Sequence, residues 1–167
     1  MQPSDCLTRI AETLYPGHSR LPIPSHFDRD ISECLQDYIP LDVESKAAAT
    51  RALGHKVLFM LLGFSERMAT HSLRTGDQGA FDMGLLSLSI TYEGHIDTRE
   101  TLLVIPLYLD VAARVGLSLD SMLTADGSFS NQLRAFIRRR PEDKRIEAMG
   151  YVLDHDNPDG VAYKRTW

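Results

Sequence analysis

Apolar residues are most concentrated at positions 97–116, in the stretch DTRETLLVIPLYLDVAARVG. Asp97 and Glu100 have the spacing of a capping box at a helix N-terminus, and Gly116 stands where a left-handed C-terminal cap is favoured. Between these ends, apolar side chains cover more than one stripe of the predicted helix, so other elements must surround it. We therefore expect the rest of the chain to pack around 97–116 and the fold to be mainly helical.

Most of the remaining chain also has the helical spacing of apolar residues, interrupted by glycine and proline. The predicted helices cover residues 4–15, 27–39, 42–74, 78–92, 118–124 and 130–139, with one more helical turn after Pro141. Gly54 and Gly63 are points where the long 42–74 run would bend or break, and Gly76-Asp77 combines a C-cap with an N-cap. The loops between the predicted helices are short, which favours antiparallel packing of helices that follow one another in the chain. Both an α-solenoid and an irregular bundle fit this pattern of helices and loops.

The last seventeen residues have a different pattern. Two short apolar segments flank the sequence Asn157-Pro158-Asp159-Gly160, in which proline at the second position and glycine at the fourth predict a tight turn. We expect a β-hairpin that pairs 151–156 with 161–166. Because two strands alone are marginally stable in water, the hairpin must pack on the helices or on another subunit.

Together these patterns predict a mainly all-α fold: an antiparallel helical array or α-solenoid-like bundle with a short C-terminal β-hairpin. The length of 167 residues and the 43% share of apolar residues fit a single domain. Within residues 1–167 we distinguish an N-terminal helical pair at 1–40, a helical core at 42–150 and the hairpin at 151–166.

Charge is unevenly distributed along the chain, which has a net charge of −5. Residues 77–127 contain eight acidic and two basic side chains, whereas residues 128–167 contain eight basic and six acidic ones. This balance argues against a dedicated nucleic-acid binder, which usually has a basic face. We expect a protein partner or a second copy of the chain instead.

Several features indicate a soluble cytoplasmic protein. The longest apolar run, 57–62, is far shorter than the roughly 20 residues that span a bilayer, so we expect no membrane partner. The N-terminal sequence MQPSDCLTRI lacks the basic and apolar segments of a signal peptide. Cys6 and Cys34 fit a reduced, intracellular protein better than a disulfide scaffold, and their places on apolar faces predict buried thiols.

The tightest cluster of acid–base groups precedes the central helix. In Glu93-Gly94-His95-Ile96-Asp97 a histidine stands beside carboxylates and could act as a general base. The alternative, which we favour, is that Asp97 caps the helix while Glu93 and His95 are solvated. We name Glu93, His95 and the nearby Arg99 as candidate binding residues, and we assign no catalytic residue.

A basic cluster lies in and after the predicted helix 130–139. Its candidate binding residues are Arg138, Arg139 and Arg140, which could hold a phosphate group or an acidic protein surface. The alternative, which we favour, is that these cations complement the helix dipole at its C-terminus. The six histidines do not have the spacing of metal ligands, so we expect no metal site and no cofactor.

The C-terminal half contains several short motifs. They are Asp97-x-Arg99, Arg139-x-Pro141-Glu142-Asp143 and Gly150-Tyr151, followed by Gly160 and Tyr163. Over about residues 75–165 this pattern resembles a group of uncharacterised bacterial helical proteins. The resemblance implies an all-α body with a small C-terminal hairpin, and it implies no activity.

The sequence contains no catalytic constellation, and our leading hypothesis is a non-enzymatic protein-interaction module, an adaptor or immunity-type binder. A helical array with segregated charge is well suited to presenting a surface. The alternative is a small-ligand-binding protein or enzyme with a pocket between helices. For that pocket the sequence offers one set of polar groups: Glu66, Arg67, His71 and His95. A third hypothesis is a homo-oligomer whose hairpins pair across subunits.

Overall fold

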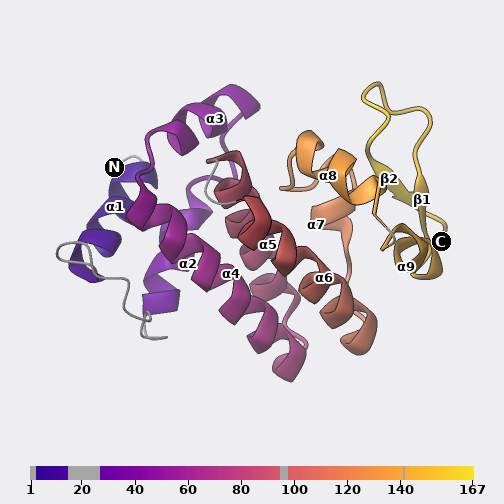
Figure 1. The fold of residues 1–167 in the computed structure, drawn as a ribbon, viewed down its shortest axis with the longest axis horizontal. Helices are drawn as coiled ribbons and strands as arrows, with labels where there is room; N and C mark the ends of the chain where they lie inside the picture. Colours follow the sequence, from indigo (N-terminus) through magenta and orange to yellow (C-terminus); the bar gives the residue numbers. More distant parts are fainter. Residues whose placement is uncertain (1–2, 15–26, 95–97, 141) are drawn as a thin grey trace.

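The computed structural model describes residues 3–14, 27–94, 98–140 and 142–167, which form a helical protein with a short hairpin (Figure 1). Its helices are α1 Pro3–Leu14, α2 Asp28–Gln36, α3 Val43–Arg51, α4 His55–Thr75, α5 Gln78–Glu93, α6 Thr98–Val115, α7 Asp120–Leu123, α8 Asn131–Arg138 and α9 Asp143–Ala148. The strands β1 Tyr151–Leu153 and β2 Tyr163–Arg165 pair antiparallel. The predicted mainly all-α fold with a C-terminal hairpin is confirmed. Among the described residues, no helix is both long and apolar enough to span a bilayer.

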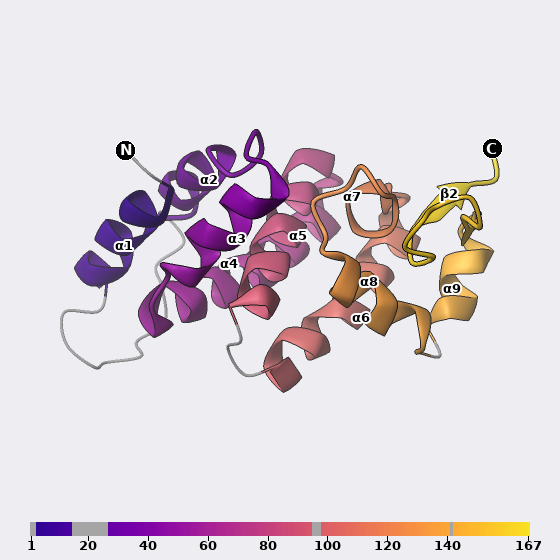
Figure 2. The same ribbon diagram turned by 90° about the horizontal axis from the view of Figure 1, so that it is seen from above.

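The elements follow chain order along the long axis of the molecule, from α1 at one end to the hairpin at the other (Figure 1, Figure 2). Helices α4 and α5 pack against each other in the middle of this array. Buried side chains form two clusters. One cluster joins α1 and α2 to the adjoining faces of α4 and α5, and the other joins the remaining faces of α4 and α5 to α6, α7, α8, α9 and the hairpin.

Helix α6 leaves part of its surface open, although its sequence predicts a helix surrounded on all sides. Ile105 and Tyr108 are completely buried, whereas Leu103 is 73% exposed. The α4–α5 pair belongs to both buried clusters, and α6 contributes only to the second. The prediction that the chain packs around 97–116 is therefore wrong, because apolar density along a helix does not specify which neighbours cover it.

Local signals set several of the observed helix ends. Gly76 has a φ of +69° and ends α4, and the Asp77 side chain then caps α5 by accepting hydrogen bonds from two backbone amides of its first turn. Gly116, at φ +71°, follows α6. The predicted 42–74 run breaks at Gly54, which precedes α4, but α4 continues through Gly63. The predicted capping role of Asp97 lies outside the described residues.

The hairpin is shorter than predicted but has the expected turn. Tyr151 pairs with Arg165 and Leu153 with Tyr163, so the strands cover only part of 151–156 and 161–166. The amide of Gly160 donates a 3.0 Å hydrogen bond to the carbonyl of Asn157, which closes the predicted tight turn. Both strands bury a tyrosine in the second apolar cluster, so the hairpin packs on the helices as expected.

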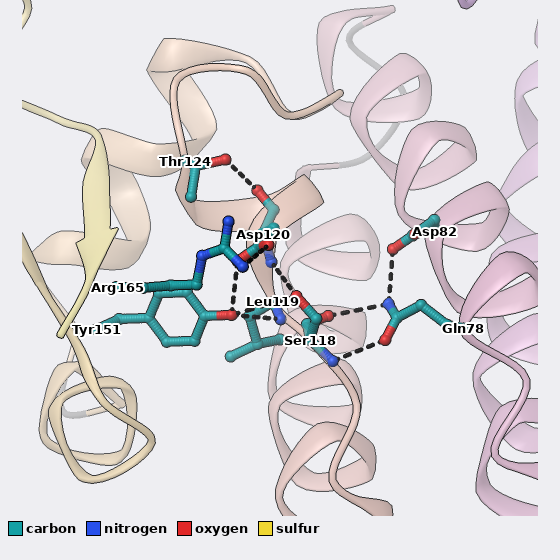
Figure 3. Close-up of polar contacts among 8 residues, drawn as sticks. All are labelled: Gln78, Asp82, Ser118, Leu119, Asp120, Thr124, Tyr151 and Arg165. Carbon is teal, nitrogen blue, oxygen red and sulfur yellow. Dashed lines mark hydrogen bonds and ion pairs between the residues drawn. The ribbon is translucent and has the colours of Figure 1, made fainter. Parts of the chain in front are cut away.

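A polar network fastens the hairpin to the helices (Figure 3). The Tyr151 hydroxyl donates to Asp120 Oδ1 at 2.9 Å and accepts a hydrogen bond from the buried amide of Leu119, also at 2.9 Å. On the other side, the Gln78 side chain of α5 accepts a bond from the Ser118 amide at 2.7 Å and donates to the Ser118 carbonyl at 3.1 Å. The segment between α6 and α7 is therefore held from both sides.

The two cysteines form a disulfide that joins α1 to α2. Cys6 and Cys34 have a Cα–Cα distance of 5.7 Å, which is within the usual range for a disulfide. The prediction of two reduced thiols is therefore wrong, and the inference of a reducing compartment loses that support. The sequence places both cysteines on apolar helix faces correctly, but it does not show that these two faces meet.

Candidate functional site

A pocket of about 420 Å³ lies between α3, α5 and the segment that leads from α7 into α8. This volume falls within the range of small-molecule sites in proteins. The turn of the hairpin borders it through Asn157 and Asp159. Apolar side chains from three separate elements line part of its wall: Val43, Ala47, Leu86, Ile90 and Phe129.

Two serines hold the walls of the pocket together. The amide of Ser130 donates a 3.2 Å hydrogen bond to the hydroxyl oxygen of Ser89 on α5. The Ser130 hydroxyl in turn accepts a hydrogen bond from the amide of Leu133, as an N-cap residue does at the start of a helix. Glu93 lies one helical turn after Ser89, and Arg134 lies one turn after Ser130, so both charged residues belong to this junction.

Buried polar atoms without partners concentrate at this pocket. Among the described residues, five buried side-chain atoms have no hydrogen-bond partner, and four of them belong to residues that line it: Tyr38 Oη, Glu93 Oε1, Ser128 Oγ and Arg134 Nε. Folded proteins nearly always pair such atoms, because a buried group left unsatisfied costs about 1–3 kcal/mol. Four such atoms therefore belong to residues around a single cavity, and each of them is enclosed by neighbouring protein atoms.

Arg134 is a buried cation with only neutral partners. The residue is 4% exposed. Its two terminal nitrogens donate hydrogen bonds to the Thr124 carbonyl and to Asn131 Oδ1. It forms no ion pair with any residue in the described part of the chain. Burial lowers the pKa of Arg134, and the charge of Asp159 offsets part of that effect. A negative group in the pocket would complete its environment.

Tyr38 contributes a hydroxyl that stays protonated. The residue is completely buried, and burial raises the pKa of its phenol to about 12. The hydroxyl therefore remains a hydrogen-bond donor at any physiological pH, and it can also accept a hydrogen bond. Ser128, on the loop before α8, adds a second hydroxyl with the same capacity.

Of the described residues in the sequence-predicted binding set, Glu93 alone lines this pocket. Arg99 is an exposed residue of α6 that does not line it, and His95 lies outside the described residues. The sequence therefore indicated one residue of this wall, and the fold places Tyr38, Ser128 and Arg134 around the same pocket.

The predicted basic cluster does not form a single site. Arg138 is exposed and donates a 2.9 Å hydrogen bond to the Gly160 carbonyl. Arg140 is paired with Glu142 at 3.2 Å and lies 4.9 Å from the ring centroid of Phe136. Arg139 is exposed. The contacts of Arg138 and Arg140 fasten α8 to the hairpin turn and to the segment before α9.

Sequence reasoning missed Tyr38 and Ser128 as site residues. It counted Arg134 in the basic cluster in and after the predicted helix 130–139 but did not name it as a candidate binding residue. A signal for Arg134 was present: the residue lies on the inward face of α8, between the buried Leu133 and Ile137. An arginine among the core positions of an amphipathic helix requires a buried partner. Tyr38 and Ser128 gave no such signal, because nothing in their local sequence shows that their hydroxyls are buried.

A second depression, of about 850 Å³, contains three residues of the other sequence-predicted pocket. Glu66, Arg67 and His71 line it, together with Asp28 from α2. Arg67 already makes a bidentate contact with Asp28, with its Nη2 at 2.7 Å and its Nε at 2.9 Å from Oδ1. The charge of this arginine is therefore neutralised within the fold. The depression thus provides less charge for a ligand to bind than the pocket at Arg134 does.

Comparison of the chain with protein-family models, with curated proteins and with solved structures finds no match. Within the described residues, no group of three or more histidine, cysteine, aspartate and glutamate side chains is arranged to hold a metal ion. The interpretation of the site therefore rests on the geometry and chemistry of the pocket.

Proposed function

We propose that this protein binds a small molecule that carries an anionic group, in the 420 Å³ pocket between α3, α5 and α8. The observation that carries the proposal is Arg134, which is 4% exposed, has an unpartnered Nε and makes no ion pair among the described residues. A carboxylate or phosphate group on a ligand would supply the missing charge and accept the free N–H.

The rest of the pocket suits a compact organic ligand. Leu86, Ile90 and Phe129 provide apolar surface, while the hydroxyls of Tyr38 and Ser128 provide hydrogen bonds at separate points. A mostly apolar wall with a few fixed polar groups is the usual composition of a small-molecule site. This proposal corresponds to the sequence-based alternative of a pocket between helices, at a different position.

The protein-interaction module and the homo-oligomer predicted from the sequence stay predictions. They differ from the ligand-binding proposal in what they require of the buried polar groups around the pocket. A protein that only presents its outer surface has no need of a buried arginine without a charged partner or of a buried tyrosine hydroxyl without a hydrogen-bond partner, and both groups reduce its stability. We therefore place small-molecule binding first.

Nuclear magnetic resonance of the Arg134 Nε–Hε group tests the proposal directly. We expect addition of acetate, succinate or inorganic phosphate to shift this resonance in a saturable manner, together with amides of Ser128 and Ser130. Arg134→Gln should abolish the binding. Arg138→Gln is the matched control, because Arg138 is exposed and lies outside the pocket lining. Binding that survives in Arg134→Gln would contradict the proposal, and so would the absence of a saturable shift both with these anions and with zwitterions that carry a carboxylate.

A further inference from the structure

We infer that the bound molecule is a zwitterion of the amino-acid type, with its carboxylate on Arg134 and its ammonium group on Glu93. This inference rests on the proposed function and specifies its ligand. It begins from a second charged group in the same pocket: Glu93 lines the cavity, and its Oε1 is buried without a hydrogen-bond partner.

Glu93 makes the pocket unfavourable for a simple anion. A carboxylate accepts hydrogen bonds and donates none, so the orphan Oε1 requires a donor from the ligand. A ligand with negative charge alone would satisfy Arg134 but would be repelled by the Glu93 carboxylate in a poorly solvated space. A ligand with a cationic amine as well as an anionic group satisfies both residues.

The fold brings these two opposite charges to one pocket without pairing them. Ser89 and Ser130 are hydrogen-bonded across the junction of α5 and α8, and each charged residue lies four positions, about one helical turn, further along its own helix. No ion pair between Glu93 and Arg134 is present among the described residues. The two side chains are thus available to the two ends of one compact molecule.

The remaining groups fit the other parts of such a ligand. The hydroxyls of Tyr38 and Ser128 can donate to a carboxylate or accept from an ammonium group. Leu86, Ile90 and Phe129 offer apolar surface to a side chain or a methylene chain. An amino acid with an apolar body therefore uses every class of group that the pocket presents.

Four related compounds test the inference by isothermal titration calorimetry. L-leucine and its isomer 6-aminohexanoate carry both charges, at short and long separation. 4-Methylpentanoate lacks only the amine of leucine, and 3-methylbutylamine lacks only its carboxylate. We expect at least one zwitterion to bind about tenfold or more tightly than both singly charged compounds, and the preferred isomer reports the charge separation that the pocket requires.

Glu93→Gln tests the proposed ammonium-binding residue by itself, because the substitution preserves the shape of the side chain and removes its charge. We expect this variant to lose the preference for the zwitterion over 4-methylpentanoate, while its affinity for 4-methylpentanoate stays equal or rises. Glu100→Gln, which removes an exposed carboxylate on α6, should behave as the wild type. Thermal unfolding of each variant verifies that it is folded.

The outcomes separate this inference from the proposed function. If 4-methylpentanoate or acetate binds at Arg134 at least as tightly as both zwitterions, the protein binds anions and the zwitterion inference is wrong. The same conclusion follows if Glu93→Gln retains the full preference. If no anion and no zwitterion perturbs the Arg134 Nε–Hε resonance, the proposed function itself fails.

Discussion

The amide of Ser130 donates a 3.2 Å hydrogen bond to the hydroxyl of Ser89, forty-one residues earlier in the chain. This bond joins α5 to the N-terminus of α8 and so fixes the two walls that carry Glu93 and Arg134. Ser89 is 5% exposed, and Ser130 is half-buried. The integrity of the pocket and part of the stability of the fold therefore depend on the same contact.

Ser89→Ala should lower the free energy of unfolding by about 1 kcal/mol, because the Ser130 amide loses its acceptor. The same variant should weaken ligand binding, since α8 is no longer held against α5. Urea unfolding and calorimetric titration measure the two effects. Thr70→Ala, which removes an exposed hydroxyl on α4, is the control and should change stability by less than about 0.5 kcal/mol. Equal effects of the two variants would argue against the role of the Ser89–Ser130 bond.

Tyr38→Phe should separate stability from function. The substitution removes a buried hydroxyl that has no partner, so at pH 7 the variant should be at least as stable as the wild type. Ligand affinity should fall, because the pocket loses a hydrogen-bonding group. Chemical unfolding and titration calorimetry at pH 7 measure both quantities. A clear loss of stability would mean that the hydroxyl is satisfied within the folded chain.

The same residue should make stability sensitive to alkaline pH. The folded state raises the pKa of Tyr38 from 10.0 to about 12, so the unfolded state releases this proton first as the pH rises. Protonated Tyr38 therefore makes its full contribution to the free energy of unfolding below about pH 10. This contribution, on the order of 2 kcal/mol, is lost progressively between about pH 10 and pH 12. Urea unfolding from pH 9 upward should show a smaller decline in Tyr38→Phe. Part of the decline remains, because burial raises the pKa of Tyr163 to about 12 as well.

Reduction of the Cys6–Cys34 disulfide should destabilise the N-terminal part of the array. The bond closes a loop with a sequence separation of 28, for which loop entropy predicts a loss of about 3.6 kcal/mol on reduction. Urea unfolding with and without a reducing phosphine measures the effect. The double variant Cys6→Ser, Cys34→Ser should match the reduced protein and should not respond to the phosphine. Identical midpoints for oxidised and reduced wild type would contradict this prediction.

Tyr151→Phe should loosen the hairpin. The variant leaves the buried Leu119 amide without an acceptor and removes the bond to Asp120, at a cost of about 1–3 kcal/mol. Hydrogen exchange of the Asp154 and Thr166 amides, which donate to Ala162 and Gly150, should become faster. Val152→Ala changes an exposed position of the same strand and should have little effect. Unchanged protection in Tyr151→Phe would show that packing alone holds the hairpin.

The sequence by itself determined most of the local structure. The Asp77 side chain, the Ser130 side chain and the 157–160 turn form the caps and the turn that their residue types predict. Each of these features depends on atoms within a few residues of one another, so local chemistry is sufficient to predict it. The all-α class and the C-terminal hairpin follow from the same short-range patterns.

Only the tertiary structure decided which distant segments meet. The Cys6–Cys34 bond, the central position of the α4–α5 pair and the exposed Leu103 all depend on how helices pack. The pocket has the same origin, because the orphan atoms of Tyr38, Glu93 and Arg134 come from three segments that are far apart in the chain. Sequence periodicity tells which residues of a helix are buried, but it does not specify the neighbour against which they are buried. For this reason the sequence indicated Glu93 as a candidate binding residue, and only the fold shows that Arg134 lines the same pocket.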